Sequence, residues 1–176
     1  MERDYDPHSE PISALAAHGT RSAGVMVPGF LGLAAGTVAL AQSLQGTTVA
    51  PEPVPGLLAL SGLTVGGAGL ARCSDRSCPT RMLGDEVVEL TDDLHAACSA
   101  ATFALWAAIP FVAAGRASTA PTSFRRGSAA MGAATVAAIV VSGRMAQRDS
   151  RWSGTGQRVF LATALAWYPL AAAFSS

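Results

Sequence analysis

The side chains best suited to chemistry lie in one stretch, residues 73–95, "CSDRSCPTRMLGDEVVELTDDLH". It holds six carboxylates, two cysteines and a histidine, although only 14% of the chain is charged. Asp92 and His95 are three residues apart, so on a helix they project from one face and could share a metal ion or a proton. Asp75 would approach from across the loop, and His8 or Asp6 could add a ligand from the N-terminal tail. A divalent ion held this way could activate water.

The same residues also have a purely structural interpretation. Thr91 is a plausible N-cap, which would place Asp92 and Asp93 in a first helical turn, where the helix dipole favours carboxylates. His95 would then be an ordinary hydrogen-bonded histidine at a helix interface. The residues alone leave both interpretations open.

Three cysteines limit what sulfur chemistry can do here. Cys73 and Cys78 flank a short turn and are too few for a structural zinc site, which needs four ligands. A disulfide between them is possible on an oxidising face of a membrane. Cys98 lies about one turn inside the following helix, where a small packing residue is expected.

Composition predicts the elements that position these residues. Half of the chain is apolar, all twelve basic residues are arginine and the net charge is zero, so nothing indicates a nucleic-acid partner. Five stretches carry no charge: 22–51, 53–71, 96–115, 127–143 and 159–176. Each can contain a helix of the roughly 17 to 25 residues that crosses a bilayer. A soluble helix would instead carry polar residues along its outer face.

The sequence therefore predicts an all-α integral membrane bundle of about five transmembrane helices. The spans are expected near residues 22–44, 55–72, 93–114, 127–144 and 157–175, after a polar tail at 1–21. The transmembrane domain is then 22–176, with the acidic loop at 73–95. Gly32 with Gly36, and Gly62 with Gly66, have the G-x-x-x-G spacing that lets helices approach closely in lipid. Such faces could pack within the bundle, or against a second copy or another membrane protein.

The order of these residues resembles a family of bacterial and archaeal membrane proteins, domain of unknown function 998. In that family a helix ends in a Phe-Pro-Cys/Thr-Asp turn, often followed by Cys-Pro, and a histidine opens the next helix. The positions that match are Cys73, Asp75, Cys78, Pro79 and His95. This chain departs from the pattern with Ala71 and Arg72 in place of Phe-Pro, and with Ser74 inserted.

Two further segments are similar to the family. They are "PISALAAHGTRSAGVMVPGF", through Ile12, Ser13, Leu15, Gly19 and Gly29, and "GQRVFLATALAW", through Gln157 and Arg158. The resemblance implies a helical bundle in the cell membrane that lacks the family's usual first helix. It implies no activity.

The resemblance also implies an orientation, with the tail, the acidic loop and the last loop outside the cytoplasm. That face would carry nine arginines and the other face three, whereas basic loops usually stay in the cytoplasm. We follow the family, because a Cys-Asp-Cys turn fits the oxidising side.

Two functions are compatible with these features. The first is a multi-pass membrane module that binds lipid or a protein partner, with an extracytoplasmic acidic loop and no cofactor. The alternative is a metal-dependent membrane hydrolase that uses Asp75, Asp92 and His95, with His8 as a further candidate ligand. A transporter is disfavoured, because no ionisable group lies inside the predicted spans. Whether the protein is an enzyme stays open.

Overall fold

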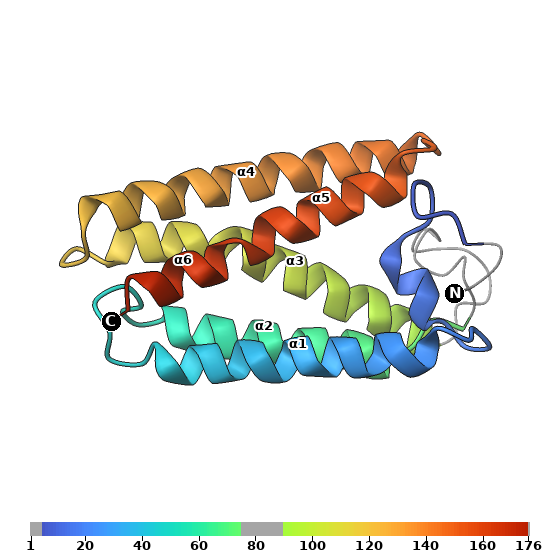
Figure 1. Ribbon diagram of the computed structural model, residues 1–176, viewed down its shortest axis with the longest axis horizontal. Helices are drawn as coiled ribbons and strands as arrows, with labels where there is room; N and C mark the ends of the chain where they lie inside the picture. The colour runs from blue at the N-terminus through green and yellow to red at the C-terminus, as the bar shows by residue number, and fades with distance from the viewer. Residues whose placement is uncertain (1–4, 75–89, 176) are drawn as a thin grey trace.

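The structure is a computed structural model that describes residues 5–74 and 90–175. Every regular element in these two ranges is helical (Figure 1). A short 3₁₀ helix, η1 (Ile12–Ala16), precedes α1 (Ala23–Ser43), α2 (Val54–Leu70), α3 (Leu90–Arg116), α4 (Thr122–Gln147), α5 (Ser153–Leu165) and α6 (Trp167–Ala173). The predicted all-α class is confirmed.

The helices pack in chain order. α1 packs on α2, α2 on α3, α3 on α4 and α4 on α5, whereas no contact of this extent joins α1 to α5. Figure 1 shows α1 and α2 along one side, α4 and α5 along the other and α3 between them, with the two chain ends at opposite ends of the bundle. The N-terminal segment, the end of α2, the beginning of α3 and the α4–α5 turn therefore share one end.

Three of the helices in the described ranges are long and apolar enough to cross a membrane: α1, α3 and α4. α2 is apolar but has only 17 residues. Large apolar side chains are exposed on the outside of the bundle, among them Val25, Leu63 and Val140. In water so much exposed apolar surface would promote aggregation, whereas lipid solvates it. These features fit a membrane protein.

Two predicted boundaries are wrong. α3 already includes Leu90, so Thr91 lies inside the helix and is not its N-cap. The predicted last span, 157–175, is two helices that meet at Ala166. Pro169 explains this break: its ring clashes with the carbonyl of the fourth preceding residue, Leu165, and it has no N–H to donate there. The sequence prediction placed no break in this span.

Glycine lets α2 approach α1 closely. A Cβ on Gly62 would lie 2.8 Å from the Val38 side chain and 2.9 Å from the Ala34 carbonyl oxygen, and a Cβ on Gly66 would touch Ala34. This predicted G-x-x-x-G pair is therefore a helix contact. Gly32 and Gly36 have nothing within 4 Å of a Cβ among the described residues, so that pair makes no contact within the bundle.

The apolar core fills the end of the bundle that holds α6. Its fully buried members include Leu44, Leu58, Ile109, Phe124 and Trp167. Trp167 donates its indole N–H to the Ser128 hydroxyl, and the Thr37 hydroxyl donates to Tyr168, so α6 is joined to both α4 and α1. The opposite half of the bundle is less tightly filled, and a cavity lies there.

Candidate functional site

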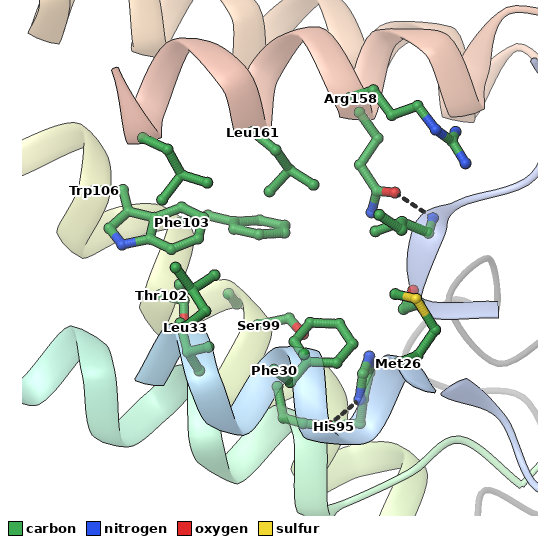
Figure 2. A pocket seen from close by; sticks show the side chains of 18 of the residues that line it. Met26, Phe30, Leu33, His95, Ser99, Thr102, Phe103, Trp106, Arg158 and Leu161 are labelled. Atoms are coloured by element: carbon green, nitrogen blue, oxygen red, sulfur yellow. Dashed lines mark hydrogen bonds between the residues drawn. The ribbon is translucent and has the colours of Figure 1, made fainter. Parts of the chain in front are cut away.

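A cavity of about 590 Å³ opens inside the bundle near the end that carries the N-terminal segment. Its walls come from α1, α2, α3 and α5, and η1 covers one end of it. Most of the lining is apolar, as Met26, Phe30, Leu33, Phe103, Trp106 and Leu161 illustrate in Figure 2. The volume lies within the roughly 300 to 1,000 Å³ of small-molecule sites.

The cavity lies where α1 and α5 are separated from each other. Phe30 of α1 and Leu161 of α5 line the same cavity, and the contact between their helices is much smaller than that between helices adjacent in the chain. At the other end of the cavity the contact of Tyr168 with Thr37 joins α6 to α1. The cavity is therefore bounded by η1 at one end and by α6 packing at the other.

His95 lies on the cavity wall with 5% of its surface exposed. Its Nδ1 is 2.8 Å from the Ala68 carbonyl oxygen and 3.0 Å from that of Ala71, at the C-terminal turn of α2. The last carbonyls of a helix have no intrahelical donor, so His95 supplies one from a neighbouring helix. This contact agrees with the structural interpretation of His95 as a hydrogen-bonded histidine at a helix interface.

Asp92, one turn before His95, is also buried. Its two carboxylate oxygens accept the backbone N–H and the side-chain hydroxyl of Ser74, both at 2.7 Å. Asp92 and Asp93 lie in the first turn of α3, as the structural interpretation expected. Asp92 thus joins Ser74, which follows α2 in the chain, to the first turn of α3.

Two arginines hold the N-terminal segment, residues 5–16, against the bundle. Arg158 of α5 donates to the carbonyl oxygens of Pro7 at 2.6 Å and Glu10 at 3.2 Å, and to the Tyr5 hydroxyl. Arg72, beyond the end of α2, donates to the carbonyls of Ala16 and Ala17. Figure 2 shows the Arg158 guanidinium directed away from the cavity.

The start of α5 completes this anchorage. The Gln157 side-chain oxygen accepts the backbone N–H of Ile12 at 2.7 Å, and the Ser153 hydroxyl donates to the Ser9 carbonyl at 2.6 Å. The segment is also ordered internally: hydrogen bonds from Ser9 and His8 to the Asp6 carboxylate lower the pKa of Asp6 below its ordinary value of 3.8. η1 is therefore held in place as one wall of the cavity.

The predicted metal ligands are not brought together where the structure describes them. His8 contacts Thr155 and Trp152 at the start of α5, whereas His95 contacts the end of α2. Within residues 5–74 and 90–175 no three His, Cys, Asp or Glu side chains are grouped so that they could hold a metal ion. Asp75 lies outside these ranges, so its approach to His95 stays a prediction.

The cysteines have different states. Cys73 is buried and disulfide-bonded, and Cys98 is a free thiol. Cys78, the predicted partner of Cys73, lies outside the described residues, so this pairing also stays a prediction. The Cys73 carbonyl accepts the N–H of His18, so the chain after α2 contacts the chain between η1 and α1.

Sequence reasoning missed the cavity and the role of Arg158. Gln157 and Arg158 were singled out only through the family resemblance, although a Gln-Arg pair at the beginning of an apolar span is itself a signal. Such side chains can reach back over the helix end to backbone carbonyls.

A helical bundle with an internal, mostly apolar cavity and three membrane-length helices defines the class of this molecule as a membrane protein. Residues 1–173 match the family described as "Protein of unknown function (DUF998)". The chain belongs to this family, as its motifs indicated. No curated protein and no solved structure gives a significant match.

Proposed function

We propose that this protein is a multi-pass cell-membrane protein that binds a lipid in the cavity between α1 and α5. The observation that carries the proposal is the cavity itself, which has mostly apolar walls and is lined by side chains of both α1 and α5. A hydrocarbon chain fits such walls, because burying each methylene contributes about 0.8 kcal/mol.

The proposal includes a topology. α2 and the combined α5–α6 unit also cross the bilayer, which makes five crossings. The N-terminal segment, with the connections at the same end of the bundle, forms an extracytoplasmic cap. The metal-ligand candidates are not grouped within the described residues, so the hydrolase alternative has no support.

Gly29 offers a direct test, because it lines the cavity and has nothing within 4 Å of a Cβ. Gly29→Phe should put a ring into the cavity and exclude the ligand. Gly24→Phe is the matched control, since Gly24 is on the same helix, is equally open and does not line the cavity. Lipids retained by the purified proteins should be extracted and compared by mass spectrometry.

The expected result is one lipid class enriched in the wild type and in Gly24→Phe but depleted in Gly29→Phe. Equal lipid content in all three proteins, with folding unchanged, would show that the cavity does not hold lipid.

A further inference from the structure

The tautomer of His95 determines what its free nitrogen can do. Both neighbours of Nδ1 are carbonyl oxygens, which only accept, so Nδ1 carries the hydrogen. In the neutral imidazole Nε2 is then an acceptor with a lone pair. Figure 2 shows this second ring nitrogen facing the open centre of the cavity. No residue in the described ranges supplies it with a donor.

Ser99 stands beside this acceptor. It follows His95 by four residues on α3, so the two side chains lie one turn apart on one face, and both line the cavity. No hydrogen bond engages its hydroxyl within the described ranges, so this group is free to donate. This part of the wall therefore presents an acceptor and a donor a helical turn apart.

Charge restricts the ligand further. Among the lining residues that the structure describes, His95 and Arg158 are the only ionisable side chains. The Arg158 guanidinium is engaged by Pro7, Glu10, Gly154 and Tyr5 and is directed away from the cavity. Among the described lining residues a phosphate or carboxylate would find no free guanidinium, and an amine would find no carboxylate. Burying an unpaired charge is costly.

From these contacts we propose that the ligand is a neutral lipid with a hydroxyl headgroup, which donates to His95 Nε2 and accepts from the Ser99 hydroxyl. The proposal rests on the proposed lipid-binding function and specifies its ligand. A hydroxyl is one donor and one acceptor, so this pair of groups satisfies it fully. The hydrocarbon body then lies along Phe30, Phe103 and Leu161.

Trp106 supplies a reporter for the test, because it lines the cavity. The other two tryptophans are elsewhere: Trp152 contacts His8, and Trp167 is buried against Ser128. Trp152→Phe with Trp167→Phe leaves Trp106 as the single fluorophore. Its quenching should be titrated, in identical micelles, with brominated stearyl alcohol, brominated stearic acid and a brominated-chain phosphatidylcholine.

We expect the alcohol to bind about tenfold more tightly than the acid or the phospholipid, a difference of about 1.4 kcal/mol. His95→Phe and Ser99→Ala should each abolish most of this preference. The control is Thr163→Ala, which removes a hydroxyl on α5 that does not line the cavity. This variant should keep the preference for the alcohol. Ser99→Ala guards against a folding defect in His95→Phe. Within the described ranges the Ser99 hydroxyl makes no hydrogen bond that this substitution would remove.

The outcomes separate the two proposals. If the acid or the phospholipid binds as well as the alcohol, and Gly29→Phe removes the quenching, lipid binding stands and the hydroxyl headgroup is wrong. If Gly29→Phe leaves all quenching unchanged, the probes do not enter the cavity and both proposals fail. A preference for the alcohol that survives Ser99→Ala and His95→Phe would also overturn the headgroup assignment.

Discussion

The Nδ1 of His95 makes a structural contact that can be tested separately from the proposed role of Nε2. His95→Ala removes the donor to Ala68 and Ala71 and leaves two carbonyls at the end of α2 without it. A typical hydrogen bond contributes about 0.5–1.5 kcal/mol, so we expect a loss of roughly 1–3 kcal/mol for the bifurcated pair and the exposed carbonyls. Thermal unfolding in detergent should show a lower midpoint.

Leu94→Ala is the control for His95→Ala, because Leu94 is adjacent and half-exposed. It should shift the midpoint far less. Equal midpoints for His95→Ala and the wild type would mean that the contact with α2 contributes nothing to stability.

For single residues, the sequence predicted those contacts that follow from spacing along a helix. The three-residue spacing of Asp92 and His95 predicted one shared helix face, and both side chains do contact the chain at the end of α2. Arg158 was not predictable in the same way, because its partners are backbone carbonyls about 150 residues earlier in the chain. Carbonyls carry no side-chain signature, so no sequence pattern identifies them as acceptors. The Nε2 environment likewise depends on the tautomer, which only the geometry reveals.

At the scale of elements, alanine substitutions at two glycines of α2 should change stability in opposite directions. Gly62→Ala would place a methyl group 2.9 Å from the Ala34 carbonyl oxygen, so α1 must shift and stability should fall. Gly56 has nothing within 4 Å of a Cβ, so Gly56→Ala should raise stability by up to about 1 kcal/mol through helix propensity. Thermal unfolding of the two variants, side by side, measures both. Destabilisation by Gly56→Ala as large as that by Gly62→Ala would contradict the close approach.

The N-terminal segment is an element whose position depends on one side chain of α5. Arg158→Gln removes hydrogen bonds from a charged donor to Tyr5, Pro7 and Glu10, which are worth roughly 1.5–3 kcal/mol each. Amide exchange at Ile12, whose N–H is held by Gln157, should accelerate about tenfold or more in hydrogen-exchange mass spectrometry.

Arg151→Gln is the comparison for this experiment. Arg151 lies at the same end of the bundle but only stacks over the Trp152 ring, 5.3 Å from its centre. Exchange at Ile12 should stay at the wild-type rate in Arg151→Gln. Unchanged exchange in Arg158→Gln would show that the other contacts of α5 suffice to hold the segment.

The helices themselves were largely predictable, because charged residues gather at the ends of the apolar stretches. α1 and α2 each lie within two residues of their predicted bounds. The division of the last span into α5 and α6 was not predicted, since Pro169 acts on a carbonyl four residues earlier. The cavity was out of reach of sequence reasoning, because it depends on the separation of α1 from α5, which the packing of all the other helices sets.

For the whole molecule, the proposed orientation predicts where the chain leaves the bilayer. Five crossings from an extracytoplasmic N-terminal segment put Ser175 in the cytoplasm. A green fluorescent protein fused after Ser175 should fluoresce, and alkaline phosphatase fused there should be inactive. The reverse result would mean that the arginines, nine at one end and three at the other, set the orientation as the positive-inside rule requires.

The contact of Arg158 with Tyr5 joins residues 153 positions apart, and this has a consequence for biosynthesis. At about 5–20 residues per second, a ribosome needs roughly 8 to 30 seconds to add α5 after Tyr5 has been made. Until then the cavity has no wall on that side and η1 has no anchor. The cavity is therefore completed only after α5 has been made, and a nascent chain stalled before α5 lacks that wall.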